Sequence, residues 1–290
     1  MILPWSLLAA QTFTVGTYNV EMYITHGFKG TKSKSESGKS KVQEQILALQ
    51  ADVLALEEIG TTNLLVELRD SLDKLGLNYP YWEFVEGSDT NLHLALLSRF
   101  PIVARRPHTK EVFLLNGRRL SVNRGFLEVD VQVNEHYRFT LLSAHLKSKR
   151  QSFIADEEEI RESEAGLLRK KVDQLLSVNV GRNVVVLGDF NDNKSSPTLK
   201  TLMGKGALGL VDTRPTERPE NGNHRERNQR ESWTFFFATE DVYSRVDYIL
   251  ISRGMAREWV SEESFVLARP DWSEASDHRP IVTQFHAKDR

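Results

Sequence analysis

Short apolar runs recur along the chain, and nearly every one ends in a carboxylate, amide or imidazole side chain. Runs rich in Val, Ile, Leu and aromatic residues, with alternation clearest in FLEVDVQV, are typical of β-strands. Within the stretch NVVVLGDFND, the apolar run of residues 184–187 is followed by Gly188, and a glycine lets the backbone come close to a neighbouring segment. The residue ranges predicted as strands are 12–20, 51–60, 81–85, 92–98, 101–104, 126–133, 137–144, 184–187, 233–238 and 242–252, with a last strand beginning at Ile281.

Helical spacing of apolar residues predicts the helices. Five leucines fall on one face of residues 61–75, which we interpret as core packing, and the longest helical pattern covers residues 155–180. A short helix is predicted at 197–203. Ser40 with Gln43 resembles a capping box and predicts the start of one more helix there.

Three segments carry no such pattern. Residues 27–41 are rich in Gly, Ser and Lys and predict a mobile basic loop, and residues 214–232 predict a polar surface excursion. Residues 1–11 form an apolar run that ends in small residues but lacks a basic beginning. We interpret them either as the remnant of an export signal or as a disordered terminus. Export is therefore favoured slightly over a cytoplasmic location.

Composition narrows the possible chemistry. The 290 residues are 40% hydrophobic and 27% charged, with a formal net charge of −2, which argues against a surface coated in basic residues for non-specific nucleic-acid binding. No stretch reaches the roughly 18 apolar residues that span a bilayer. The chain has no cysteine, so thiolate metal sites and cysteine nucleophiles are excluded, and any metal must bind oxygen or imidazole.

Polar residues gather at the ends of the predicted strands, where a rigid scaffold can hold a site. Each one alone has an ordinary structural explanation, such as a turn or a satisfied core histidine. Asp189 and Asn191 are expected to point the same way from an extended segment, with Asp192 pointing away. The set consists of Asn19 with Glu21, Glu58, His145, Asp189 with Asn191, Asp247, and Asp277 with His278.

These residue types fit one chemistry together. Carboxylates and an amide without sulfur suit a hard cation such as Mg²⁺ or Mn²⁺, which also takes phosphate oxygens. The two histidines suit proton transfer near neutral pH. Lys147, Lys149 and Arg150 follow His145 and favour a phosphate-facing rim.

In order along the chain, the motifs YNVE, LEEI, SAHLKS, GDFND, RVDYIL and SDHRP resemble those of the endonuclease/exonuclease/phosphatase superfamily, also called DNase I-like. Periodicity alone indicates only α/β or α+β. The resemblance implies an α+β fold, a four-layer αββα sandwich, in one domain spanning residues 12–290. It also implies an active site at one edge of the two packed sheets.

The resemblance also implies roles for individual residues. The metal-binding set is Asn19, Glu21, Glu58 and Asp277, for Mg²⁺ or Mn²⁺, with the number of ions left open. The catalytic set is His145, Asp189, Asn191, Asp247 and His278. Lys147 and Arg124 are candidates for binding substrate phosphate. Arg161 and Glu164, three residues apart on a helix, are expected to form a structural ion pair.

The implied reaction is in-line attack of water on phosphorus, assisted by the metal, with Asp189 and His278 orienting and deprotonating the water. Which of the two is the base stays open. Asp247 would orient His278, and His145 would donate to a phosphoryl oxygen.

Two departures from the family pattern concern the metal and the substrate. Glu57 stands where glutamine is commoner, and Met22 follows YNVE, so the surroundings of the metal differ. The inositol-phosphatase signature is absent, and the sequence supplies no aromatic wedge of the kind expected for abasic-site repair.

The leading hypothesis is a phosphodiesterase or nuclease that acts as a monomer on a phosphoester, with nucleic acid among the candidate substrates. The alternatives are a phosphomonoesterase or a sphingomyelinase-like lipid phosphodiesterase. A hypothesis from a different functional class is that the chain is a catalytically inactive binding module on the same fold.

Overall fold

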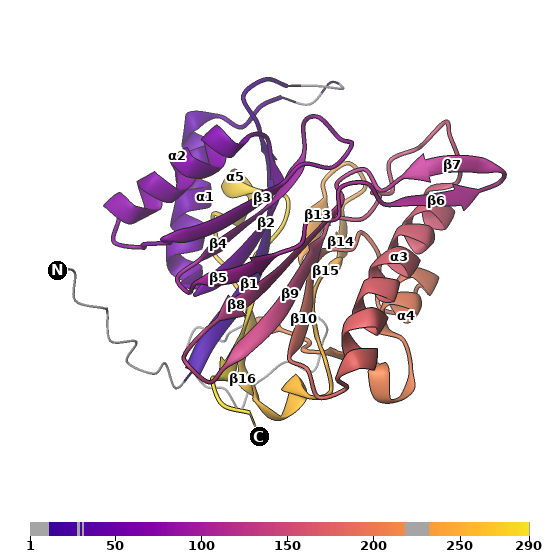
Figure 1. The fold of residues 1–290 in the computed structure, drawn as a ribbon. Coiled ribbons are helices and arrows are strands. Elements are labelled where there is room, and N and C mark those ends of the chain that lie inside the picture. Colours follow the sequence, from indigo (N-terminus) through magenta and orange to yellow (C-terminus); the bar gives the residue numbers. More distant parts are fainter. Residues whose placement is uncertain (1–11, 28–29, 31, 218–231, 290) are drawn as a thin grey trace.

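Two β-sheets packed face to face form the centre of the computed structural model, which describes residues 12–27, 30, 32–217 and 232–289 (Figure 1). The seven-stranded sheet has the order β12 (Thr216–Glu217), β16 (Trp259–Val266), β17 (Ile281–His286), β1 (Thr12–Tyr23), β2 (Val53–Ile59), β4 (His93–Ser98) and β3 (Tyr81–Val85). The six-stranded sheet has the order β11 (Val211–Asp212), β15 (Asp247–Ile251), β10 (Val184–Asp189), β9 (Arg138–Ala144), β8 (Phe126–Gln132) and β5 (Ile102–Arg105).

Strand alternation fills the space between the sheets with apolar side chains. Phe13 and Val15 of β1 pack in the same buried cluster as Val185 and Leu187 of β10. Because side chains alternate, later residues of the same parity in each strand also point into this layer. The inner face of each strand thus changes from apolar to polar at its end.

Helices cover both outer faces, which makes four layers (Figure 1). The side chains of α1 (Glu36–Leu49) and α2 (Thr62–Lys74) pack on the seven-stranded sheet, and those of α3 (Glu157–Val178) and α4 (Pro197–Met203) pack on the six-stranded sheet. Side chains cap the helix starts: Thr61 accepts from Leu64, and Asp156 accepts from Glu158 and Glu159. The αββα sandwich predicted from the sequence is confirmed. Short elements η1 (Gly206–Leu208), η3 (Met255–Arg257) and α5 (Trp272–Ala275) complete the described helices.

The predicted start of α1 is wrong. Ser35 is the N-cap residue, and its hydroxyl oxygen accepts a hydrogen bond from the backbone of Gly38 at 3.0 Å. Ser40 therefore lies inside the helix, and the predicted basic loop of residues 27–41 ends before Glu36. The helix itself was predicted, and the glycine, serine and lysine content of the segment hid only its first turn; Val42 and Ile46 lie on its buried face, as expected.

Several strands differ from the prediction. A hairpin of β6 (Val112–Leu115) and β7 (Arg118–Ser121) turns at Asn116 and Gly117, both at positive φ. The predicted strand 242–252 is divided into β14 (Val242–Ser244) and β15, with β14 paired to β13 (Phe235–Phe237). The hairpin and strand β16 carry no prediction from the sequence pattern.

Two predictions concern residues that the structure does not describe. Residues 1–11, with the possible export signal, lie outside the described ranges, and so do residues 218–231 of the predicted surface excursion. Among the helices that are described, none is long and apolar enough to cross a bilayer.

Candidate active site

The polar strand ends meet in one pocket at the edge between the two sheets. β1 and β2 run parallel in one sheet, and β9 and β10 run parallel in the other, so each pair delivers its carboxyl ends together. The pocket has a volume of about 570 Å³. The predicted site residues that line it are Glu21, Glu58, Arg124, His145, Lys147, Asp189, Asn191, Asp277 and His278. Asn19 and Asp247 do not line it but contact residues that do.

Asp189 lies where the two sheets touch. Asn19 and Asp189 occupy inner-face positions of β1 and β10, and the Asn19 amide Nδ2 donates to Asp189 Oδ2 at 3.1 Å. The same carboxylate accepts from the backbone and the side chain of Asn191, at 2.9 and 3.2 Å. Asp189 and Asn191 thus lie together as expected, although Asn191 reaches back through a turn at φ 53° rather than along an extended strand.

Gly188 permits this approach of Asp189 to the second sheet. Its φ is 129°, and an added Cβ would lie 2.1 Å from the carbonyl oxygen of Ala144. Only glycine is compatible with that backbone and that contact. The strand β10 is thereby held close to β9 where His145 begins the following loop.

His278 is held by two carboxylates from the six-stranded sheet. Its Nδ1 lies 2.9 Å from Asp247 Oδ2, and its Nε2 lies 3.7 Å from Asp189 Oδ2. The backbone of His278 donates to the Ser276 hydroxyl, which itself donates to the carbonyl of Asn19 at 2.7 Å. The loop that carries His278 is thus fixed to the end of β1.

Burial and neighbouring charges set the protonation states of His278 and Asp189. Burial alone would lower the pKa of His278, but the charges of Asp247 and Asp189 outweigh it and raise the pKa well above the ordinary value. Burial raises the pKa of Asp189 to about 7, against the charge of His278 and with that of Asp247. Near neutral pH, a charged imidazole therefore lies beside a carboxylate that can gain or lose a proton.

His145 is a second buried imidazole beside the same oxygen of Asp189. Its Nε2 lies 3.4 Å from Asp189 Oδ2, and its Nδ1 has no partner among the described residues. Burial, together with the charges of Arg124 and His278, lowers the pKa of His145 well below the ordinary value. His145 is therefore neutral, with one ring nitrogen available as a donor or an acceptor.

The acidic ends of β1 and β2 are bulged. The pairing shifts between Asn19 and Tyr23 of β1 opposite Glu57 and Ile59 of β2. Glu21 and Glu58 both have positive φ, 43° and 69°. Bulges and strained backbone of this kind re-aim side chains at functional sites.

The adjacent carboxylates Glu57 and Glu58 lie in different surroundings. Glu58 reaches the pocket, and its Oε2 accepts from the backbone of Met22 at 2.8 Å. Glu57 is fully buried, and its Oε1 accepts from the Thr17 hydroxyl at 2.7 Å. Burial raises the pKa of Glu57 well above the ordinary value, an effect that the Thr17 hydrogen bond only partly offsets. We therefore interpret Glu57 as a neutral carboxylic acid below the site.

The donors that face the pocket fit a hard divalent cation. Glu21, Glu58 and Asp277 place three carboxylates around one part of the pocket. Burial raises the pKa of Asp277, with contributions from Glu21 and Glu58 in the same direction and an opposing one from His278. This mutual repulsion is what a bound cation would relieve.

A different group has the close ligand spacing of a metal site. Ligand atoms of Asp189, Asp247 and His278 all lie within 4.8 Å of one another, the one such cluster among the described His, Asp and Glu residues. Asn19 was predicted as a metal ligand. Its Oδ1 accepts from the backbone of Glu21 at 3.0 Å, so its contacts also give it a positioning role.

Lys147 and Arg124, the two candidates for binding substrate phosphate, differ in how far their own hydrogen bonds occupy their donor groups. Lys147 Nζ donates to the carbonyls of Ser148 and Arg150, both at 2.7 Å, so its ammonium organises its own loop. Arg124 donates through Nη1 to the carbonyl of Leu146 at 3.3 Å, and its buried Nε has no partner among the described residues. Arg124 is the better placed of the two to bind an anion.

The expected ion pair between Arg161 and Glu164 is not formed. Arg161 pairs with Asp192 at 3.1 Å, and Glu164 accepts from the backbone of Lys147 at 2.7 Å. Arg161 also donates to the carbonyl of Lys147, so both residues hold this segment against α3. Their role is structural, as predicted, and Asp192 does turn away from the pocket.

Sequence reasoning missed two residues of the site. Lys34, inside the predicted basic loop, lies 3.5 Å from Glu21 and donates to the carbonyl of Ala275 at 2.7 Å, which links β1 to the loop before His278. Phe235 lines the pocket, and its ring centroid lies 4.7 Å from that of His278. Phe235 lies within a predicted strand, but no sequence pattern places either residue at the site.

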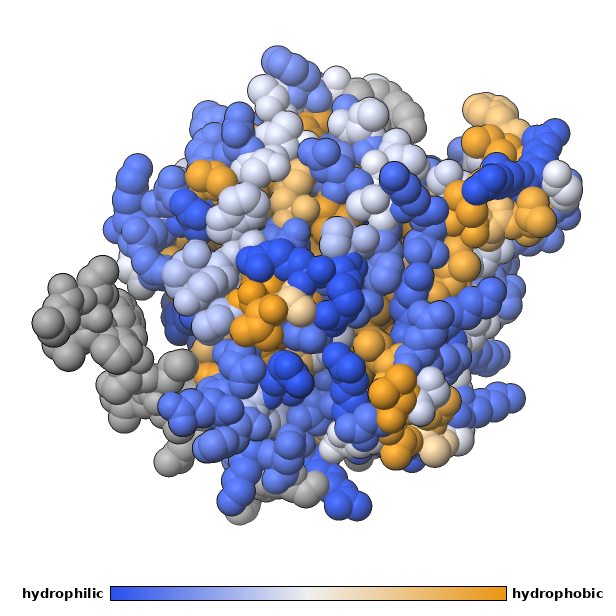
Figure 2. All heavy atoms as spheres, viewed as in Figure 1, coloured by the Kyte–Doolittle hydropathy of each residue, from blue (hydrophilic) through white to orange (hydrophobic). Residues whose placement is uncertain are grey.

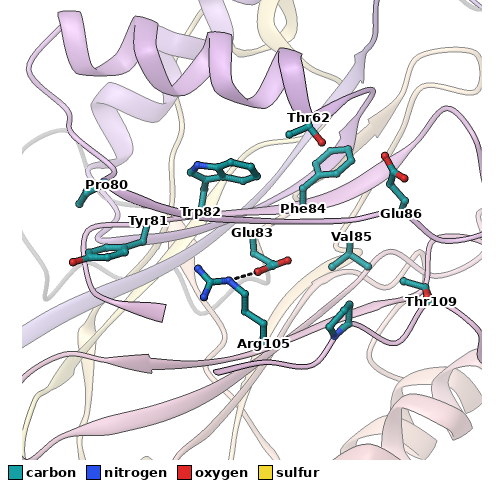
Figure 3. Close-up of a pocket in the computed structure, with 11 residues that line it drawn as sticks. Thr62, Pro80, Tyr81, Trp82, Glu83, Phe84, Val85, Glu86, Arg105 and Thr109 are labelled. Carbon is teal, nitrogen blue, oxygen red and sulfur yellow. Dashed lines mark ion pairs between the residues drawn. The ribbon is translucent and has the colours of Figure 1, made fainter. Parts of the chain in front are cut away.

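A larger cavity, of about 730 Å³, lies beside the edge strand β3 (Figure 3). It is lined by aromatic residues including Tyr81 and Trp82, with Glu83 paired to Arg105 at 2.6 Å. It shares no lining residue with the pocket of Asp189 and His278. Predicted site residues therefore line the smaller pocket and not this cavity.

Stacked sheets with carboxylates, amides and imidazoles at one edge define a fold of the phosphoesterase and nuclease type. The chain belongs to the Endonuclease/Exonuclease/phosphatase family, whose sequence profile matches residues 16–278. No protein in a search of curated sequences matched.

Solved structures share this fold at low sequence identity. Truncated Caenorhabditis elegans TDP2 has 17% identity and a TM-score of 0.64, covering 95% of this chain and 98% of its own. The human nocturnin catalytic domain with bound sulfate has 18% identity and a TM-score of 0.67, covering 96% and 95%. Sphingomyelinase C from Streptomyces griseocarneus has 18% identity and a TM-score of 0.65, covering 95% and 99%. These likenesses establish the fold.

Proposed function

We propose that the protein is a metal-dependent phosphodiester hydrolase of the nuclease type. The observation that carries the proposal is the surroundings of Asp189, which contacts Asn19 and Asn191 and has Oδ2 3.4 Å from His145 Nε2 and 3.7 Å from His278 Nε2 in one pocket. An inactive binding module would have no need to hold a titratable carboxylate and a charged imidazole together.

The reaction is attack of water on phosphorus, in which the P–O bond to the water oxygen forms as the P–O bond to the leaving alcohol breaks, and the leaving oxygen takes a proton from solvent. Asp189, with its pKa of about 7, takes the proton of the attacking water, and Asn191 orients that water. His278, kept charged by Asp247, stabilises the negative charge that develops on the phosphoryl oxygens. Neutral His145 and the guanidinium of Arg124, which line the same pocket, bind the remaining phosphoryl oxygens.

Glu21, Glu58 and Asp277 would hold Mg²⁺ or Mn²⁺. When bound, the cation neutralises charge on the phosphoryl and leaving oxygens. Lys34 and the backbone of Met22 keep two of these carboxylates in place.

The test is release of nitrophenol from bis(4-nitrophenyl) phosphate in the presence of Mg²⁺ or Mn²⁺. We expect turnover by the wild type, and a fall in kcat of roughly 10²- to 10⁴-fold in His278→Ala. His136→Ala, at an exposed histidine away from the pocket, is the matched control and should keep full activity. Absence of turnover of both this diester and 4-nitrophenyl phosphate, with either cation, would refute the proposal that the protein is a phosphoester hydrolase. Turnover of the monoester alone would favour a phosphomonoesterase.

A further inference from the structure

A fully exposed phenylalanine stands at the mouth of the catalytic pocket. Phe153 is 97% exposed and Ile154 is 57% exposed, and both line the pocket that contains Asp189 and His278. They lie in the loop between β9 and α3. Two adjacent apolar side chains left in water at the rim of a pocket indicate a surface that contacts a ligand.

The loop is built to present this ring. The Lys147 ammonium donates to two carbonyls of the loop, and Arg118 of the β6–β7 hairpin donates to the carbonyl of Ile154 at 3.2 Å. The backbone of Ile154 donates to the Ser152 hydroxyl at 3.2 Å. Hydrogen bonds at both ends thus fix the loop while the ring of Phe153 contacts solvent.

Basic side chains accompany Phe153 in the pocket. Arg124, Lys147 and Arg150 line the same pocket, opposite in charge to a phosphodiester backbone. A ligand that satisfies both features must carry an anionic backbone and flat π-faces. Nucleic acid has both, and aromatic side chains stack on its bases with little dependence on sequence.

We propose that Phe153 stacks on an unpaired base next to the scissile phosphate, so that the substrate is a single-stranded nucleic acid or a single-stranded end. The inference rests on the proposed phosphodiesterase function and names its substrate class. In a duplex, both faces of a base are already stacked, and opening a step costs a few kcal/mol. An unpaired strand offers its bases without that cost.

A lipid surface is the competing substrate, and the arrangement of apolar residues favours it less. Membrane contact requires a contiguous apolar face. Leu114, 76% exposed, is on the β6–β7 hairpin but lines a separate groove against α3 with Leu167 and Lys170. Figure 2 shows hydrophilic and apolar side chains interspersed where this hairpin projects.

The experiment compares the KM values of two single-stranded oligonucleotides of equal length. One is an oligothymidylate, and the other is an abasic strand that keeps the phosphodiester backbone but lacks bases. Stacking of one base is worth about 1–3 kcal/mol, so wild-type protein should have a KM for oligothymidylate that is roughly 5- to 150-fold below that for the abasic strand. In Phe153→Ala this ratio should fall toward one, and Phe153→Trp should restore it. Tyr81→Ala, at an exposed aromatic residue of the β3 cavity, is the matched control and should keep the wild-type ratio.

Binding in EDTA, followed by fluorescence anisotropy of labelled oligothymidylate, separates this inference from the proposed function. Binding that weakens in Phe153→Ala supports stacking even where wild-type protein hydrolyses no diester, in which case only the proposed function fails. The inference is overturned if Phe153→Ala keeps the wild-type KM ratio, or if Phe153→Ala instead loses binding to phosphatidylcholine and sphingomyelin vesicles.

Discussion

At the scale of single residues, the site depends on a glycine as much as on its acids. Gly188 has a φ of 129°, and a Cβ at this position would lie 2.1 Å from the Ala144 carbonyl oxygen. Any side chain must push β10 away from β9, and Asp189 would move with it. The conformational freedom of this glycine is therefore a requirement of the catalytic geometry.

We expect Gly188→Ala to destabilise the fold by at least about 3 kcal/mol, since left-handed strain and a backbone clash act together. Thermal or urea unfolding measures this. Gly166→Ala is the matched control, because Gly166 lies within α3 and an added Cβ meets nothing within 4 Å. The control should gain up to about 1 kcal/mol from helix propensity. Equal stability of the two variants would contradict the role given to Gly188.

The alternation of side chains along each strand predicts the direction of several site residues. Asn19, Asp189 and Asp247 share the parity of the buried inner-face residues of their strands, so the sequence alone directs them toward the facing sheet. Periodicity does not predict what happens after each strand ends. The turn at Asn191 and the positive φ of Glu58 are set by tertiary contacts, and no local pattern reports them.

At the scale of elements, the sequence pattern predicts most helices and strands, but it misses some elements and displaces some boundaries. The predicted start of α1 is displaced because two serines compete as caps, and burial of the first turn at Gly38 selects Ser35. The β6–β7 hairpin carries an Asn-Gly turn, a strong signal for a hairpin, and could have been found. The pairing partner of a strand such as β16 is a long-range property that local sequence does not encode.

The ion pairs on β8 make stability depend on pH. Burial raises the pKa of Glu128, but hydrogen bonds from His108 and Arg106 outweigh it and hold the pKa below the ordinary value of 4.5. A carboxyl with a lowered folded-state pKa stabilises the protein above its unfolded pKa, and that stabilisation is lost as pH falls through the folded value.

We therefore expect the free energy of unfolding, measured in urea, to fall as pH decreases from about 5. Glu128→Gln should be less stable than wild type at neutral pH and should lose less stability over the acidic range. Glu135→Gln, at an exposed turn position, is the control and should follow the wild-type curve. A wild-type slope in Glu128→Gln would show that this carboxyl does not cause the dependence.

At the scale of the whole molecule, the site lies where separate parts of the fold are joined. Glu21 and Glu58 end two parallel strands, and Asp277 comes from the loop before β17, more than 200 residues later in the chain. Without a cation these carboxylates repel one another, and Lys34 beside Glu21 offsets only part of that charge. A cation that binds the folded state and not the unfolded state should therefore stabilise the entire domain against unfolding.

Addition of Mg²⁺ or Mn²⁺ to metal-free protein should raise the Tm. At a concentration one hundred times the Kd, the stabilisation is about 2.7 kcal/mol, which corresponds to a shift of roughly 5 °C for a domain of this size. Glu58→Gln removes one ligand charge and should lose most of the shift, whereas Glu83→Gln, in the β3 cavity, should keep it. Because Tm is read without substrate, the result is independent of the reaction. An equal shift in Glu58→Gln and wild type would place the cation elsewhere, and the cluster of Asp189, Asp247 and His278 would then be the next site to test.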